Sequence, residues 1–293
     1  MRNFLYKILL LCLLSIIIIP FSLMLFNSLN RDILKTGFLK NKIGSRGHTF
    51  SRLKEVNKFS NIDILFIGSS HAYRGYDTRI FDNHGYTSFN LGTPAQTPIQ
   101  TKYLLEKHIK KLAPKLIIID VYQKLFTLRG NESTIDLLSN TSNIGLDELK
   151  LCIETNSFEA FKSLIVSFLT NKKKFIEPKN KTYDTYVSGG FVQSSKTIYD
   201  VSDPTPPTSK KLLKSQFENI DSIIKIAKNN NSRIILIKSP ITKHFYKKFK
   251  ISSVFDSIMD KKGEYYNINK TDIIDSLFFY DKDHLTQKGV EVY

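Results

Sequence analysis

The hydrophobic residues of this chain gather in short runs, each long enough for one buried β-strand. Three such runs occupy residues 62–67, 87–92 and 115–122. Between the second and third runs, apolar residues recur at helical spacing, at Ile99, Tyr103, Leu104 and Ile109. The order strand, helix, strand predicts a parallel strand pair joined by a crossover helix.

The same combination returns late in the chain. A helical stripe of apolar residues is formed by Leu212, Leu213, Phe217, Ile220, Ile223, Ile224 and Ala227. Asparagines at 229–231 end this helix, residues 233–240 follow as a strand, and a final strand is expected within 263–268. Because the strands are nearly continuous in Ile and Leu, both faces of the sheet should be covered. We therefore predict a three-layer α/β/α fold with a mostly parallel sheet of about five strands.

The strand pattern lapses between residues 127 and 210. We expect one helix there, at 158–169, followed by a stretch rich in lysine and asparagine, a pair of glycines at 189–190 and a proline-rich segment at 203–207. An insertion of this size in a compact domain is often functional, as a lid or an acceptor-binding cap. A surface elaboration explains the same pattern equally well.

Near the start of the chain, 19 residues at 8–26 carry no charge. As a helix they would reach roughly 28 Å, close to the thickness of a bilayer core. A cleaved signal peptide and a buried core helix are the alternatives, but the run is long for either and no A-x-A cleavage site follows. We expect a transmembrane anchor at 1–30, a juxtamembrane linker at 31–60 and a folded domain at 61–293. Basic residues flank both ends of the apolar run, so charge does not favour a body outside the cytoplasm.

The formal net charge of +16 predicts attraction to anionic surfaces, without ranking phospholipid headgroups, acidic glycans or other polymers. Lysines are scattered rather than interleaved with aromatic residues, so a solvated surface is favoured over nucleic-acid binding. Cys12 lies in the apolar run and Cys152 in the body, so no internal disulfide and no cysteine-rich metal site are expected.

A serine stands where open α/β sheets bind their ligands. Gly68, Ser69 and Ser70 follow the first strand directly, at its carboxyl end. A turn of small residues exposes the last hydroxyl and presents amide N–H groups to a developing oxyanion. Small residues also end many strands for conformational reasons alone, so the turn makes Ser70 only a candidate nucleophile.

A carboxylate and an imidazole follow the last predicted strand. Asp281 and His284 are three residues apart, a spacing that on one helical turn places both side chains on the same side. A carboxylate on Nδ1 fixes the imidazole tautomer and leaves Nε2 free to take a serine proton. Alone, this pair is common by chance, but it should converge with Ser70 at one edge of the sheet.

These positions resemble two blocks of the SGNH/GDSL hydrolase superfamily, over roughly residues 62–293. The first block carries the nucleophile at a position equivalent to Ser70, and the last, D-x-x-H, matches Asp281 and His284 with Leu285 and Gly289 following. Ser69 in place of the usual aspartate resembles the membrane-anchored bacterial branches that include teichoic acid D-alanyl transfer and alginate O-acetylation proteins. The resemblance implies an SGNH, flavodoxin-like fold and a Ser70, His284, Asp281 triad that needs no cofactor.

The second and third blocks of that family match less well. Asn90, Gly92 and Ala95 fall on N-x-G-x-x-G, so the backbone amide of Gly92 or of Ala95 is the expected oxyanion donor. The third block falls on residues 120–123 and lacks its asparagine. Tyr122 or Gln123 is a substitute donor, or Tyr122 is a core residue at a strand end.

His71, directly after the nucleophile, is a rival base. Adjacent residues usually diverge, so we expect it to line the pocket or face solvent. A metal site from His71, Asp281, Asp283 and His284 lacks the clustered ligand spacing that supports such sites, and no metal is expected.

The resemblance implies a single-pass protein of the bacterial cytoplasmic membrane with an extracytoplasmic catalytic body. We expect a serine esterase or O-acyltransferase that acts on an acylated cell-surface polysaccharide or related polymer, beside a membrane-bound acyl-transfer partner. Two alternatives stay open, a catalytically inactive glycan-binding or scaffold protein of the same fold and a basic nucleic-acid-binding protein. The former is motivated by the missing asparagine.

Overall fold

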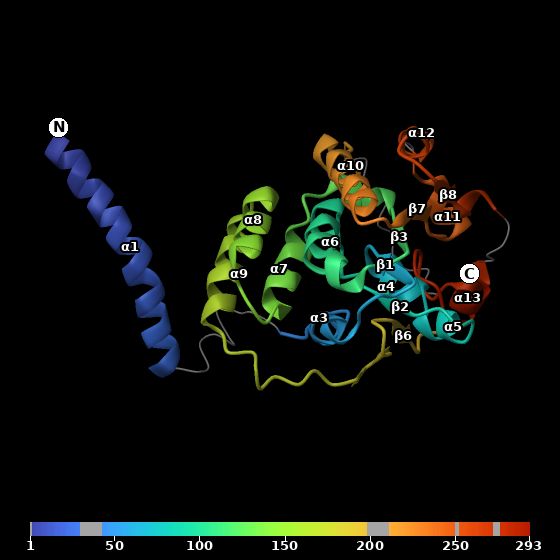
Figure 1. Cartoon of the computed structure of the whole chain (residues 1–293), viewed down its shortest axis with the longest axis horizontal. Helices are drawn as coiled ribbons and strands as arrows, with labels where there is room; N and C mark the ends of the chain where they lie inside the picture. The colour runs from blue at the N-terminus through green and yellow to red at the C-terminus, as the bar shows by residue number, and fades with distance from the viewer. Residues whose placement is uncertain (1, 30–42, 198–210, 250–251, 272–275) are drawn as a thin grey trace.

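The computed structural model describes residues 2–29, 43–197, 211–249, 252–271 and 276–293 (Figure 1). One helix, α1 (Arg2–Leu29), stands apart from a body that holds the other elements. Within these described residues, no helix combines the length and hydropathy required to cross a membrane. The proline-rich segment 203–207 and residues 31–42 of the expected linker lie outside them.

A parallel sheet of five strands forms the centre of the body. Its strands are β1 (Ile64–Ile67), β2 (Ser88–Asn90), β3 (Leu116–Asp120), β7 (Arg233–Lys238) and β8 (Tyr265–Asn267), in the order β2-β1-β3-β7-β8. Every neighbouring pair runs parallel. The mostly parallel sheet expected from the apolar runs is therefore confirmed, because each run lies in a strand that helices cover on both faces.

Successive residues of β1 face two different helical layers. Leu65 and Ile67 belong to the main core with α6 (Pro98–Leu112) and α10 (Lys214–Asn229). Ile64 and Phe66 pack instead with residues of α4 (Ser70–Gly75) and α5 (Thr78–Asp82). The three-layer prediction is confirmed, and the carboxyl end of β1 runs directly into α4.

The segment between β3 and α10 contains more structure than the sequence pattern indicates. Its helix α9 (Phe158–Leu169) coincides with the expected one, but α7 (Asn131–Asn140) and α8 (Leu146–Thr155) precede it. An antiparallel sheet of β4 (Asn180–Lys181), β5 (Asp184–Tyr186) and β6 (Val192–Ser194) follows. The spacing of apolar residues does not predict helix α7, because much of its buried face is polar, at Ser133, Thr134, Asp136, Ser139 and Asn140.

Two elements lie within the stretch expected as a linker at 31–60. Helix α3 (Thr49–Glu55) and the 3₁₀ turn η1 (Val56–Lys58) pack into the body, where Phe50, Arg52 and Val56 are buried. The remaining elements are η2 (Gln123–Thr127), α11 (Lys243–Lys247), α12 (Ser252–Asp260), η3 (Ile268–Lys270), η4 (Ser276–Phe278) and α13 (Gln287–Val292).

Candidate active site

The turn after β1 places Ser70 at the start of helix α4. Ser69 caps this helix, because its hydroxyl oxygen accepts a hydrogen bond from the His71 amide at 3.3 Å. Gly68 has φ +150°, and a Cβ there would stand 2.9 Å from the Cβ of Asp120 on β3. Only glycine therefore allows this close approach between the two strand ends. The Ser70 amide belongs to the first helical turn, whose N–H groups have no acceptor within the helix.

Asp281 and His284 lie between η4 and α13 and join Ser70 in one chain of contacts. His284 Nδ1 is 2.9 Å from Asp281 Oδ2, and His284 Nε2 is 2.8 Å from Ser70 Oγ. The tautomer that this arrangement favours has Nδ1–H donating to Asp281 and Nε2 accepting the Ser70 hydroxyl proton. The structure thus brings together three residues that are up to 214 positions apart.

The local geometry of this pair differs from the helical turn assumed from its spacing. Residues 280–283 form bends rather than helix, and a bridge between Phe279 and Leu285 closes this loop. Asp281 Oδ1 accepts hydrogen bonds from the amides of Asp283, at 2.9 Å, and His284, at 2.7 Å. The carboxylate therefore organises its own loop as well as the imidazole, which helical spacing does not predict.

Asp283 is a second carboxylate beside the imidazole that the sequence argument treated only as a rejected metal ligand. Its Oδ1 lies 3.2 Å from His284 Nδ1, and its Oδ2 accepts the Tyr122 hydroxyl at 3.0 Å. Burial disfavours the imidazolium, but the charges of Asp283 and Asp281 outweigh it and raise the pKa of His284 to about 9. Although burial opposes ionisation of Asp283, the nearby His284 holds the pKa of this carboxyl well below its usual range.

Two of the expected oxyanion groups are engaged elsewhere. The Gly92 amide donates to Asn90 Oδ1 at 3.0 Å, and Asn90 Nδ2 donates to the carbonyl of Ala72 at 2.7 Å. A Cβ on Gly92 would stand 2.9 Å from Ser69 O and from Tyr73 N, so this glycine is required for packing against the nucleophile turn. Asn90 and Gly92 support the loop, and the Gly92 amide, one of the two expected oxyanion donors, donates instead to the Asn90 side chain.

Ala95 and Tyr122, two further groups expected near the oxyanion, differ in whether their donors are already engaged. Ala95 adopts φ +51°, and among the described residues no acceptor takes its amide proton. Tyr122 cannot replace the missing asparagine, because its hydroxyl is directed to Asp283. Gln123, the other substitute, accepts a hydrogen bond from buried Lys238 at 3.2 Å. Gln123 Nε2 has no hydrogen-bond partner among the described residues, so this side-chain amide remains a candidate oxyanion donor beside the backbone amides of Ser70 and Ala95.

His71 is buried beside the triad, where it lines a small cavity and does not face solvent. Its ring centroid is 4.2 Å from that of Tyr122 and 5.4 Å from that of His284. Burial lowers its pKa despite Asp120, whose Oδ2 is 3.6 Å from Nδ1, so the ring is neutral. A cavity of about 10 Å³ between His71, Asp283 and His284 has room for about one water molecule.

The same three residues present nitrogen and oxygen atoms within 4.8 Å of one another, a grouping that a metal ion requires. However, His284 already directs Nε2 to Ser70 and Nδ1 to Asp281. A metal on either nitrogen would break one of these contacts. The arrangement is therefore better described as a hydrogen-bonded triad with a second carboxylate.

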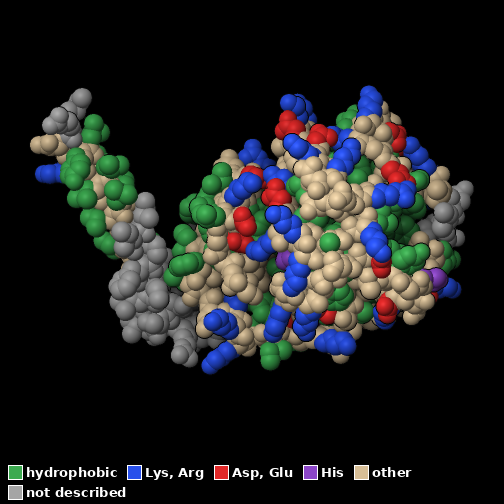
Figure 2. Space-filling model, viewed as in Figure 1, with side chains coloured by type: hydrophobic (Ala, Val, Ile, Leu, Met, Phe, Trp, Pro, Cys, Tyr) green, Lys and Arg blue, Asp and Glu red, His purple; other side chains and the backbone are tan. Residues whose placement is uncertain are grey.

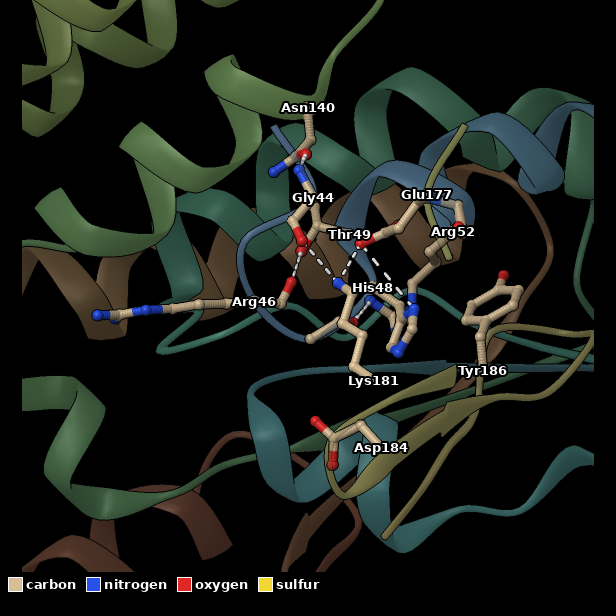
Figure 3. A network of polar contacts seen from close by, with 12 residues as sticks. Gly44, Arg46, His48, Thr49, Arg52, Asn140, Glu177, Lys181, Asp184 and Tyr186 are labelled. Carbon is tan, nitrogen blue, oxygen red and sulfur yellow. Dashed lines mark hydrogen bonds and ion pairs between the residues drawn. The ribbon is translucent and has the colours of Figure 1, made fainter. Parts of the chain in front are cut away.

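A buried polar network surrounds Arg52, which also contacts the helix that begins at Ser70 (Figure 3). Arg52 on α3 donates from Nη1 to the carbonyl of Gly47 and from Nε to that of Gly190, each at 2.9 Å. Its guanidinium lies 4.9 Å from the ring centroid of Tyr73 on α4. Gly190 in turn abuts Asn90, since a Cβ on it would stand 2.2 Å from Asn90 O. Arg52 thus ties α3, the β5–β6 turn and the Asn90 loop together.

Glu177 belongs to the same network and binds both the backbone of α3 and a lysine side chain. Its Oε2 accepts the Ser51 amide at 2.8 Å, and its Oε1 accepts Lys181 Nζ at 2.5 Å (Figure 3). Nothing in the hydrophobic pattern marks these residues, because they lie in the expected linker and the insertion. A buried arginine between two glycine-containing turns is recognised only in three dimensions.

Comparisons with known proteins give distant likenesses only. No family model and no curated protein matches the chain. Among solved structures, it is similar to a GDSL-like lipase from Bacteroides thetaiotaomicron, with 11% identity and a TM-score of 0.41 over 84% of this chain and 93% of that one. A candidate acylhydrolase from Bacteroides fragilis has 13% identity and a TM-score of 0.40 over 86% and 93%. Likenesses this weak carry no argument about activity, which depends on the site itself.

Proposed function

We propose that the protein is a serine-dependent acyl esterase or O-acyltransferase. The observation that carries this proposal is the unbroken contact chain from Asp281 through His284 to Ser70, at 2.9 and 2.8 Å. Both distances lie within hydrogen-bond reach, and they join an acid, a base and a hydroxyl in the order that nucleophilic catalysis requires. Neither a metal site nor a binding surface requires a carboxylate, an imidazole and a hydroxyl to be hydrogen-bonded in this order.

The proposed reaction has two steps. His284 Nε2 takes the Ser70 proton while Ser70 Oγ attacks an ester carbonyl carbon, and the amides of Ser70 and Ala95 stabilise the oxyanion. The ester oxygen then leaves as an alcohol with the proton from His284, which forms an acyl-serine. Water or a hydroxyl acceptor, deprotonated by His284, attacks this intermediate and restores Ser70.

Covalent labelling with a fluorophosphonate probe tests the proposal directly. The probe should label the wild-type protein and fail to label Ser70→Ala. An exposed serine elsewhere gives the matched control, so Ser60→Ala should label like the wild type. If folded wild-type protein takes up no probe and cleaves no acetyl ester, the enzymatic assignment is wrong.

For substrate and location we propose an acylated, anionic cell-surface polymer outside the cytoplasm, with the apolar run 8–26 as membrane anchor and a membrane-bound acyl-transfer partner. The net charge of +16 supports an anionic substrate, and the uncharged run supports the anchor.

A single reporter cysteine tests the location. Cys152 is buried, which raises its pKa to about 11 and makes it a poor nucleophile. In a Cys12→Ala background, Ser195→Cys on intact cells should react with a membrane-impermeant thiol reagent, and protection until lysis would contradict the proposal.

A non-catalytic glycan-binding protein is the second candidate. It is favoured by one observation, that Tyr122, which falls on the position of the family's asparagine, directs its hydroxyl to Asp283 and supplies no side-chain amide there. The fluorophosphonate experiment separates the two candidates. A purely binding protein has no reason to react at Ser70 in preference to Ser60.

A further inference from the structure

Two helices of the insertion expose apolar stripes that no part of the described chain covers. On α8, Leu146, Leu149 and Ile153 are exposed at intervals of three and four residues. On α9, the exposed residues are Phe158, Ile165 and Phe168. Figure 2 shows apolar side chains at the surface of the body on the side where Figure 1 places α8 and α9.

The opposite faces of these helices are already buried, so the stripes are not a displaced core. Leu151 and Cys152 of α8 and Ala160 and Val166 of α9 are each at most 3% exposed. By contrast, Phe158 and Phe168 each leave 72% of their surface exposed. Helices that are apolar on two sides indicate a second apolar neighbour beyond the body.

The loop that follows α9 in the chain carries positive charge and a further exposed apolar residue. Ile176 is 83% exposed, and the exposed lysines Lys173, Lys174 and Lys179 surround it in sequence. An apolar tip flanked by lysines suits the boundary between acyl chains and anionic headgroups. A dimer of this chain would instead bring these like charges together, which disfavours a second copy as the neighbour.

The chain itself restricts how far this surface can lie from a membrane. Residues 30–42 join α1 to the body and span at most about 45 Å when fully extended. The described body begins at residue 43, where the Gly44 amide donates to Asn140 on α7 at 2.7 Å, and α7 packs against α8 and α9. In Figure 1, α13, which follows His284 in the chain, lies on the opposite side of the body from α8 and α9. An anchored body therefore has its apolar helices, not its catalytic edge, nearest to the anchor.

We propose that the exposed face of α8, α9 and the 173–179 loop lies on an anionic lipid surface. The inference rests on the proposed membrane anchor but not on catalysis. It gives the insertion a defined task, which is to hold the body on the bilayer with the triad directed away from it. In this orientation Ser70 acts on a polymer beyond the membrane surface rather than on bilayer lipid.

A tryptophan reporter tests the proposal cleanly, because the chain contains no tryptophan. Full-length Phe168→Trp is placed in nanodiscs of anionic lipid with brominated acyl chains, which quench only tryptophan in contact with them. Tyr266→Trp is the matched control, an exposed aromatic position on β8 at the far side of the body. We expect blue-shifted emission and several-fold stronger bromolipid quenching at position 168 than at 266. Adding Lys173→Glu and Lys174→Glu should weaken the quenching at 168.

Three outcomes would overturn the proposal. Emission at position 168 that is quenched by aqueous acrylamide and not by bromolipid, whether or not the protein stays with the disc, means that the surface faces water. Blue-shifted emission without bromolipid quenching means that a second copy or another protein covers it. Equal bromolipid quenching at 168 and 266 means that no particular face contacts lipid. None of these readouts requires ester cleavage, so the proposal stands or fails separately from the enzymatic assignment.

Discussion

Replacing Asp283 with asparagine should shift the pH dependence of the proposed reaction toward acid. Asp283 Oδ1 lies 3.2 Å from His284 Nδ1, and this residue is the larger of the two carboxylate influences that raise the His284 pKa from 6.5 to about 9. The base must be neutral to accept the Ser70 proton, so wild-type activity should rise with pH through about 9. Asparagine removes the charge and keeps an oxygen that accepts the Tyr122 hydroxyl.

The size of the shift follows from the two carboxylates. If Asp283 supplies about half of the increase, its loss lowers the apparent pKa by roughly one unit, or about 1.4 kcal/mol of imidazolium stabilisation. At pH 7 the neutral fraction of His284 would then rise from about one in a hundred to about one in ten. At pH 7, Asp283→Asn should therefore show about one tenth of its own alkaline-plateau activity, whereas the wild type shows about one hundredth of its plateau.

The assay is kcat/KM for a chromogenic acetyl ester from pH 6 to pH 10, with circular dichroism at each pH to verify folding. Asp281→Asn serves as the comparison, because it removes the carboxylate that orients the tautomer and should lower the plateau itself. An apparent pKa for Asp283→Asn equal to that of the wild type would refute the reasoning. So would a wild-type profile that is already flat above pH 7.

Three further changes test the supporting structure. Gly92→Ala should slow fluorophosphonate labelling and lower the free energy of unfolding in urea by about 1–3 kcal/mol, because the new Cβ would stand 2.9 Å from Ser69 O. The control Gly145→Ala, whose Cβ would have no neighbour nearer than 3.6 Å, should change neither the labelling rate nor the stability. Burial raises the pKa of Asp136 to about 7. Between about pH 4 and 7 the native state therefore binds more protons than the unfolded chain, so the free energy of unfolding should fall as the pH rises through this window. Asp136→Asn should lose that dependence, and parallel melting temperatures for the two proteins from pH 5 to 8 would contradict the assignment. Arg52→Lys keeps the positive charge but loses the two guanidinium hydrogen bonds to the carbonyls of Gly47 and Gly190, so fluorophosphonate labelling of Ser70 should slow. An unchanged labelling rate would show that the Asn90 loop does not depend on Arg52.

The strands, the principal helices and the layer order could be predicted because their signals are local. A run such as 62–67 or a stripe such as 212–227 reports burial through spacing alone, and parallel strands then bring their carboxyl ends to one edge. The same reasoning led from Ser70, Asp281 and His284 to a shared site. Helix α7 could not be found in this way, because its buried side chains are largely polar and become acceptable only through hydrogen bonds to other elements.

The sequence by itself determined the α/β architecture and the residue types at the catalytic edge, since periodicity and strand ends depend on neighbours in the chain. Tertiary structure alone decided which groups those residues meet. Tyr122 and Asp283 are 161 positions apart, and Arg52 reaches a carbonyl 138 positions away. The direction of a side chain that meets a partner so far away in the chain depends on packing of the whole body. Protonation of His284 belongs to this second class, because its pKa depends on a second carboxylate placed by a loop and held by a distant tyrosine.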